Sequence, residues 1–500
     1  MSTARILAID QGTTTSRALV VDDRGTVLGI GQEAFRQHFP LPDRVEHDPM
    51  EIWSSTTEAV ATALAGAGIA ARELSCIGVT NQRETLVLWD RATGEPLTNA
   101  IVWQDRRTAM MCAGLQRDGH EPAIAHATGL TIDPYFTATK LAWLLREHPE
   151  WQERGASGEI AAGTVDSWLM WKLTGGAIHA SDFTNASRTM LFNIRRGRWD
   201  AELCRLFEVP QEMLPRAQPS IGTFGVTADE ALGARIPITG VAGDQQAALF
   251  GQACAAPGQA KNTYGTGAFL LAPAGQEPRE SKQRLLVSLG ASTGQAGPEY
   301  VLEGSVFVAG AAIQWLRDQV GAIETAAESE ELAASVPDTG GVVFVPAFTG
   351  LGAPYWDAEA RGAVMGLSRG SGRAHLARAA LEAIALSCAD LVAAMNDDLP
   401  EPISELRVDG GAARNDLLMQ MQADLADIPV VRPTNTETTA LGAAYLAGIG
   451  AGIWAGGDEV ASLWKAERTF EPAMEPDRRE EKLETWHRAI SRVRGFAAGG

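Results

Sequence analysis

The sequence is short of several residue types that would mark other classes of protein. Its 500 residues include five cysteines, at positions 76, 112, 204, 254 and 388, with none of the close Cys/His spacing of a zinc site. An odd, scattered set favours reduced, buried thiols, and hence the cytoplasm, over a disulfide framework. No Gly-Lys dipeptide occurs anywhere, which excludes the Walker A type of phosphate loop.

Positive charge and long apolar runs are also scarce. Lys and Arg total 42 against 62 Asp and Glu, a formal net charge of −20, so the basic footprint of a nucleic-acid-binding protein is missing. No apolar run reaches the roughly 20 residues that a membrane-spanning helix needs. Since the chain enters an apolar strand at once, we expect neither a secretory leader nor membrane insertion. An acidic globular protein of roughly two to four domains remains.

A hydroxyl-rich turn near the N-terminus is the most informative stretch. Apolar runs at 6–9 and 18–21 flank residues 10–17, a pattern that predicts a β-hairpin. The turn offers a glycine, the hydroxyls of Thr13, Thr14 and Thr15, and the Arg17 guanidinium, which together suit phosphate. Asp10 is placed to hold Mg²⁺, which prefers few protein oxygens and keeps its waters. A hairpin whose threonine hydroxyls simply face solvent would have the same sequence pattern. This turn alone therefore leaves open whether it binds phosphate.

Three later stretches repeat the pattern of an apolar run followed by a glycine turn. They are residues 238–251 with Asp244 and Gln245, residues 264–267 with Thr266, and residues 406–415 with Gly411 and Asn415. A helix that starts with small residues near 307–316 offers a further N-terminus for phosphate. In this order and spacing, the four stretches resemble the nucleotide-binding fold of sugar kinases, actin and Hsp70, and more closely the FGGY family of carbohydrate kinases.

Two signature sequences strengthen the resemblance to the FGGY family. Residues 135–147 and 362–382 match them, and the similarity runs from about residue 6 to about residue 452. It implies a two-domain α/β protein with the sugar-kinase/actin/Hsp70-like ATPase fold, built from duplicated ribonuclease H-like domains. We expect an N-terminal domain at 1–250, with the acceptor and phosphate/Mg²⁺ site, and a C-terminal domain at 251–500, with the adenosine site. A hinge is expected at 251–258.

Within the family, the similarity is strongest to members that phosphorylate glycerol. It implies transfer of phosphate from ATP, with Mg²⁺, to glycerol, giving sn-glycerol 3-phosphate in the first step of glycerol catabolism. A cytoplasmic homodimer or homotetramer is expected. The implied catalytic base is Asp244, which with Asp10 would also bind the metal. The implied glycerol contacts are Arg83, Glu84, Trp103, Tyr135, Asp244, Gln245 and Phe269. The implied nucleotide contacts are Thr13, Thr14, Thr15, Arg17, Thr266, Gly310, Gln314, Gly411 and Asn415.

The residues of the acceptor pocket also permit plainer interpretations. Arg83 and Glu84 would contribute little as a surface ion pair, and Trp103 would serve equally well in a core. Their position at the carboxyl ends of strands, where α/β proteins bind ligands, favours a binding role. Two rival functions are kept: another FGGY sugar kinase of the xylulokinase type, and, as the weaker alternative, an actin/Hsp70-class ATPase that needs no acceptor.

Local signals predict further details. Asp48 before Pro49 and Glu51 predicts a helix start, and His375 is interpreted as a helix-start residue rather than a catalytic one. Residues 290–294 have the Gly-x-Ser-x-Gly form of a hydrolase nucleophile elbow, but residues 295–298 do not open the helix that an elbow requires. Residues 185–192 also resemble the family, and their sequence suggests only a packing role.

Overall fold

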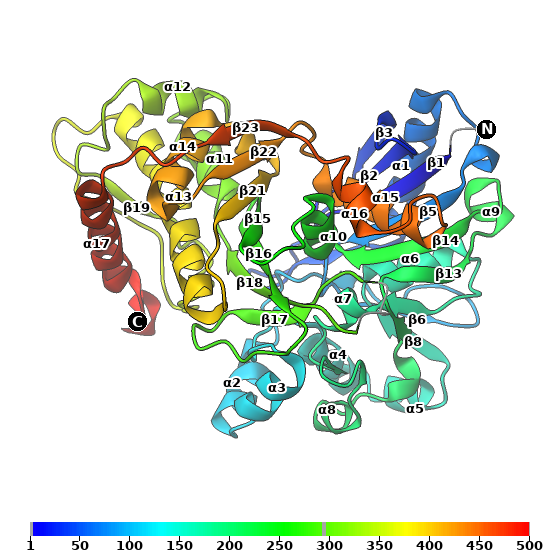
Figure 1. Ribbon diagram of the computed structural model, residues 1–500. Coiled ribbons are helices and arrows are strands. Elements are labelled where there is room, and N and C mark those ends of the chain that lie inside the picture. Colours follow the sequence, from blue (N-terminus) through cyan, green and yellow to red (C-terminus); the bar gives the residue numbers. More distant parts are fainter. Residues whose placement is uncertain (1–3, 293–296, 500) are drawn as a thin grey trace.

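Two mixed β-sheets, one of six strands and one of seven, organise the described part of the chain (Figure 1). The structure is a computed structural model that describes residues 4–292 and 297–499. The first sheet contains β13 (Ile221–Val226), β14 (Pro237–Gly243), β5 (Cys76–Asn81), β1 (Arg5–Gln11), β2 (Thr15–Asp22) and β3 (Val27–Ala34), in that order. The second contains β17 (Leu286–Leu289), β18 (Tyr300–Val306), β16 (Ala268–Gly275), β15 (Gln259–Tyr264), β21 (Glu405–Asp409), β22 (Val430–Pro433) and β23 (Ala466–Phe470).

The two sheets share a core of five strands. β1, β2 and β3 form an antiparallel meander, and β5 and β14 then add in parallel beside β1. In the same way β15, β16 and β18 form a meander, and β21 and β22 add in parallel beside β15. This repeated topology confirms the duplicated α/β fold that the resemblance implies. The predicted hairpin is also confirmed, with Asp10 paired opposite Arg17.

Helices cover both sheets, and short strand pairs extend the first half. The helices of the first half are α1 (Pro49–Ala67), α2 (Ala109–Arg117), α3 (Glu121–Thr128), α4 (Thr137–Glu147), α5 (Glu150–Ala156), α6 (Val165–Leu173), α7 (Phe183–Ala186), α8 (Ala201–Leu206), α9 (Asp229–Leu232) and α10 (Asp244–Gly251). The helices of the second half are α11 (Gly310–Asp318), α12 (Glu328–Ala334), α13 (Arg373–Asp398), α14 (Asp416–Ala426), α15 (Thr438–Gly450), α16 (Gly457–Ala461) and α17 (Pro476–Val493). The short strand pairs are β4 (Glu46–His47) with β7 (Ala100–Ile101), β6 (Val87–Asp90) with β8 (Ile160–Gly163), β9 (Ala180–Asp182) with β12 (Arg216–Gln218), β10 (Phe192–Asn193) with β11 (Arg198–Trp199), and β19 (Val343–Val345) with β20 (Ala363–Met365).

The predicted helix starts are confirmed. The Asp48 side chain accepts from the Met50 N–H over 2.7 Å and caps α1. His375 Nδ1 accepts from the Gly372 N–H over 3.2 Å at the start of α13. Of the sequence with the form of a nucleophile elbow, Thr293 and Gly294 lie outside the described residues. Among residues 4–292 and 297–499, no helix is both long and apolar enough to span a bilayer.

Helices α10 and α15 pack against each other between the two halves (Figure 1). Although α15 lies late in the sequence, it packs on β1, β5 and β14 of the first sheet, while α10 also contacts β15 and β16 of the second. Glycine permits this close approach: a Cβ at Gly442 would lie 1.9 Å from the Ala247 carbonyl oxygen, and one at Gly78 would lie 2.1 Å from the Ala443 oxygen. The two halves are therefore joined through closely packed backbone.

Candidate active site

The predicted phosphate turn closes the β1–β2 hairpin. The Gly12 N–H donates to the Thr15 carbonyl over 2.9 Å, which defines the turn. Thr14, at its tip, is exposed. Trp103 Nε1 donates to Thr13 Oγ1 over 2.9 Å, so the turn touches a residue predicted for the acceptor pocket. The structure thus places residues predicted to bind phosphate beside a residue predicted to bind the acceptor.

Arg17 and Asp10 face each other beside this turn. Arg17 forms an ion pair with Glu437 from the second half and donates to Gln32 Oε1 over 2.9 Å. Burial raises the pKa of Asp10 to about 7; Arg17 opposes this rise, and the negative charges of Asp244 and Glu437 add to it. Asp10 is therefore a desolvated carboxylate close enough to Asp244 to feel its charge, and a cation at this point would stabilise both.

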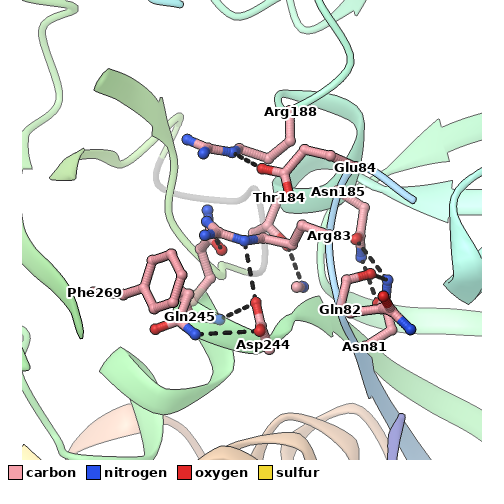
Figure 2. Close-up of polar contacts among 12 residues, drawn as sticks. Asn81, Gln82, Arg83, Glu84, Thr184, Asn185, Arg188, Asp244, Gln245 and Phe269 are labelled. Carbon is pink, nitrogen blue, oxygen red and sulfur yellow. Dashed lines mark hydrogen bonds and ion pairs between the residues drawn. The ribbon is translucent and has the colours of Figure 1, made fainter. Parts of the chain in front are cut away.

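Arg83 and Glu84 lie inside the protein, so the surface ion-pair interpretation is wrong. Their exposed fractions are 3% and 1%, and each has a different partner (Figure 2). Arg83 Nε lies 3.1 Å from Asp244 Oδ1. Its terminal nitrogens donate to both carboxylate oxygens of Glu303 over 2.6 and 2.8 Å. Glu84 Oε1 accepts from Arg188 Nε over 2.6 Å. The two residues therefore belong to a buried ionic network.

Three predicted aromatic residues gather around this network. The ring centroids of Trp103 and Tyr135 are 5.7 Å apart, and those of Trp103 and Phe269 are 6.2 Å apart, both edge-to-face. Trp103 follows β7, Tyr135 precedes α4, and Phe269 lies on β16. Both halves of the chain therefore contribute to the aromatic lining.

Gln245, in the first turn of α10, is held at both ends of its amide. Its Nε2 donates to Asp244 Oδ2 over 3.2 Å, and its Oε1 accepts from Lys261 Nζ. Lys261 is buried, which lowers its pKa to about 8, and it also donates to Thr263 Oγ1 over 3.0 Å and to the Phe269 carbonyl over 3.2 Å. Because an ammonium group only donates, it holds the amide oxygen of Gln245 and directs the NH₂ toward Asp244.

The other residues predicted for the nucleotide, beyond those of the β1–β2 turn, lie in the second half, near the ends of β15 and β21. In the β15–β16 turn, the Thr266 carbonyl accepts from the Ala309 N–H over 2.8 Å, which joins this turn to the start of α11. Gly310 and Gln314 lie in the first turns of that helix. The turn and the helix N-terminus therefore form one surface.

A Gly-Gly turn follows β21. Gly410 has a φ of +85°, and a Cβ there would lie 2.5 Å from the Tyr264 carbonyl oxygen, so only glycine fits. Gly411 opens a short 3₁₀ helix, and Asn415 caps α14, its side-chain oxygen accepting from the Leu418 N–H over 2.8 Å. The turn therefore lies against the end of β15, close in the chain to Thr266.

Sequence reasoning missed three charged residues of the site. Arg188 lies within residues 185–192, whose sequence suggests only a packing role, while Glu303 and Lys261 are charges within the buried strands β18 and β15. Their relative exposures are all 0%. For Glu303 the signal available in the sequence was an isolated charge inside an apolar strand, because a buried charge needs a partner. The largely polar sequence of β15 and the segment after α7 gave no such signal for Lys261 and Arg188.

Comparison with known proteins gives full-length matches. Residues 5–251 match the N-terminal domain of the FGGY family of carbohydrate kinases, and residues 260–451 match its C-terminal domain. The glycerol kinase of Aromatoleum aromaticum is 59% identical over 494 residues, which is 99% of each chain. That of Trichlorobacter lovleyi is 55% identical over 492 residues, 98% of this chain and 99% of its own. The crystal structure of Plasmodium falciparum glycerol kinase with ADP has a TM-score of 0.90 at 34% identity and covers 98% of both chains.

The matched ranges include every residue that the sequence analysis assigned to the site. They also include the three charged residues that it missed. The duplicated fold and these full-length matches lead to the same conclusion: the chain belongs to the FGGY family of carbohydrate kinases.

Proposed function

We propose that the protein transfers the γ-phosphoryl group of ATP to glycerol, giving sn-glycerol 3-phosphate and ADP. The observation that carries the proposal is the predicted acceptor pocket, in which Arg83 and Gln245 contact Asp244, Glu84 joins the same buried ionic network through Arg188, and three aromatic rings lie edge-to-face. The polar groups can donate to and accept from three hydroxyls. The rings of Trp103, Tyr135 and Phe269 would line a short carbon chain and leave little volume beyond three carbons. Relatives named glycerol kinase match over almost their full length, which supports the same acceptor.

Asp244 is the general base in this proposal. Its Oδ1 lies 3.1 Å from Arg83 Nε and accepts from the Gln245 backbone N–H over 2.8 Å, so the carboxylate is oriented before the acceptor arrives. In the reaction, the acceptor hydroxyl gives its proton to Asp244 while its oxygen bonds to the γ-phosphorus. The bond from that phosphorus to the bridging oxygen breaks, and ADP leaves. Because the transition state is loose, alignment and charge neutralisation supply most of the acceleration.

The nucleotide would lie across the two halves. The contacts proposed for its phosphates in the first half are Thr13, Thr14, Thr15 and Arg17, and those proposed in the second half are Thr266, Gly310, Gln314, Gly411 and Asn415. The first half (1–250) would thus hold the acceptor and the transferred phosphate, and the second (251–500) the adenosine. Closure about residues 251–258 would exclude water and limit ATP hydrolysis.

Asp10 and Asp244 are proposed to hold Mg²⁺. In the described part of the chain, no cluster of three or more His, Cys, Asp or Glu side chains could form a metal site. Mg²⁺ fits two carboxylates nevertheless, because it keeps several waters and takes its other ligands from substrate phosphates. Burial raises the pKa of Asp10 although Arg17 opposes the rise, so a bound metal ion would stabilise its ionised form. When bound, the metal would neutralise charge on the phosphates.

The cellular setting and assembly are also proposals. The five cysteines are free thiols and all are buried, in keeping with a reducing cytoplasm. A homodimer or homotetramer is the proposed assembly. Coupled ADP release, measured with and without glycerol, tests the function directly: release that depends on glycerol is expected, and equal release in its absence would instead indicate an ATPase without an acceptor.

A further inference from the structure

We infer that Arg188 and Glu303 are positioning residues of the acceptor pocket, which hold Glu84 and Arg83 in the orientation that recognises the hydroxyl groups of glycerol. The inference rests on the proposed function, because it concerns the same acceptor. It assigns a role to two buried charges that the catalytic scheme leaves unused.

The charges of the network alternate along a continuous line. Glu84 accepts from Arg188 over 2.6 Å, and Arg188 Nη2 donates to Glu303 Oε1 over 3.2 Å. Glu303 accepts from Arg83 through both its oxygens, and Arg83 Nε lies 3.1 Å from Asp244. The residues proposed to touch glycerol are Glu84, Arg83 and Asp244. The two that connect them, Arg188 and Glu303, are each 0% exposed.

Glu303 is the centre of this line. Burial alone would raise its pKa, but the charges of Arg188 and Arg83 bring that pKa down to about 2. Glu84 keeps a raised pKa, since burial outweighs the attraction of Arg188 and Arg83. Glu303 therefore stays ionised at neutral pH and holds both guanidinium groups. A bidentate pair of this kind fixes the direction of an arginine as well as its charge.

Arg188 restrains a residue whose backbone is already held in an uncommon conformation. Glu84 has a φ of +61°, in the left-handed region that non-glycine residues seldom occupy. Its carbonyl accepts from Thr137 Oγ1 over 3.1 Å and from Lys140 Nζ over 3.3 Å. The Arg188 guanidinium lies 5.6 Å from the ring centroid of Tyr135. Backbone and side chain of Glu84 are thus fixed by separate contacts, and those on the side chain depend on Arg188.

Glu303 also connects the pocket to the second half of the chain. It lies on β18, whereas Arg83 and Arg188 come from segments after β5 and α7 of the first half. Acceptor recognition therefore depends on how the second sheet meets the first. Without Glu303, the two buried guanidinium groups would lie close together with no negative charge between them. Arg83 would also lose the bidentate contact that sets its direction.

The test uses Glu303→Gln, Arg188→Met and Arg188→Lys in the full-length protein. Because misplacement of a recognition group by about 1 Å can cost about 10²-fold, we expect kcat/KM for glycerol to fall by roughly that factor in Glu303→Gln and Arg188→Met. The loss should appear mainly as a raised KM for glycerol, with KM for ATP unchanged. The preference for glycerol over 1,2-propanediol should fall too. Arg188→Lys keeps the positive charge but lacks the planar guanidinium that donates to two groups at once, so its kcat/KM for glycerol should lie between those of Arg188→Met and wild type.

Lys482→Met is the matched control. Lys482 pairs with Glu382 over 2.7 Å between α17 and α13, so this variant also loses a partly buried ion pair, and its glycerol KM should stay at the wild-type value. Wild-type enzyme that releases no ADP in response to glycerol would refute the proposed function. If wild type responds, a folded Glu303→Gln enzyme with normal glycerol KM and preference would overturn the inference, whatever its melting temperature. Glu303→Gln keeps the side-chain volume and decides the matter if Arg188→Met is insoluble.

Discussion

Replacing Asp244 with asparagine removes the proposed base with little change of shape. In the structure, Oδ1 faces Arg83 Nε and the Gln245 backbone N–H, while Oδ2 accepts from the Gln245 amide. Asparagine can keep its oxygen toward the first two groups. Its NH₂ would then face the NH₂ of Gln245, and Lys261 holds that amide so that it cannot turn over. The variant therefore loses one hydrogen bond as well as the proton acceptor.

The expected effect is on turnover and not on folding. Loss of a general base typically costs about 10²–10⁴ in rate, and at about 1.36 kcal/mol per tenfold this raises the barrier by about 3–5 kcal/mol. The Asp244 side chain is 28% exposed in the first turn of α10, where loss of a carboxylate costs roughly 0.3–1 kcal/mol of stability. Coupled ADP release at saturating glycerol and ATP measures kcat, and circular dichroism checks the fold. Near-normal turnover by folded protein would refute the role of Asp244 as base.

Three further predictions concern size selection, the metal and the C-terminal helix. Phe269→Ala should relax the size limit before it abolishes activity, so the ratio of kcat/KM for xylulose to that for glycerol should rise; an unchanged ratio would remove Phe269 from the lining. Asp10→Asn should weaken Mg²⁺ binding, so that a higher Mg²⁺ concentration is needed for half-maximal rate, and an unchanged Mg²⁺ dependence would count against this ligand. His487 Nε2 lies 2.8 Å from Asp390 Oδ1, and this hydrogen bond raises the His487 pKa. The contribution of this ion pair to the free energy of unfolding should therefore be complete below the unfolded-state pKa of about 6.5 and vanish as pH rises through the raised folded-state pKa. Urea unfolding at several pH values should show wild type more stable than His487→Gln at low pH only. A stability difference that grows with pH would contradict the prediction.

The features that could be predicted from the sequence are local ones. The turn after Asp10, the capping of α1 by Asp48 and the Gly-Gly turn at Gly410 each follow from residues within a few positions of one another. Glycine, proline and capping residues restrict the backbone where they stand, so their effects survive in any tertiary setting. The positions of the loops could be predicted for this reason, and with them the ends of strands where a site would form.

The partners of the pocket residues could not be predicted, because they lie far away in the chain. Arg83 meets Glu303 across 220 positions, and Arg188 meets Glu84 across 104. Arg17 was expected to serve phosphate alone, but in the structure it also pairs with Glu437, 420 positions away. Such contacts depend on how distant segments of the chain pack together, and no local pattern encodes that arrangement. Depth of burial, which turns a supposed surface pair into a buried network, is fixed in the same way.

The central claim is that the acceptor is glycerol. The most direct test compares kcat/KM for glycerol, dihydroxyacetone, 1,2-propanediol and xylulose in the coupled ADP-release assay. Sites that hydrogen-bond a hydroxyl reject analogues that lack it much more strongly than apolar pockets reject one extra methylene. We predict the highest value for glycerol, an intermediate one for dihydroxyacetone, a low one for 1,2-propanediol and almost none for xylulose, because the proposed lining of Trp103, Tyr135 and Phe269 would exclude its longer chain. Xylulose matching or exceeding glycerol would contradict the account and indicate a sugar kinase.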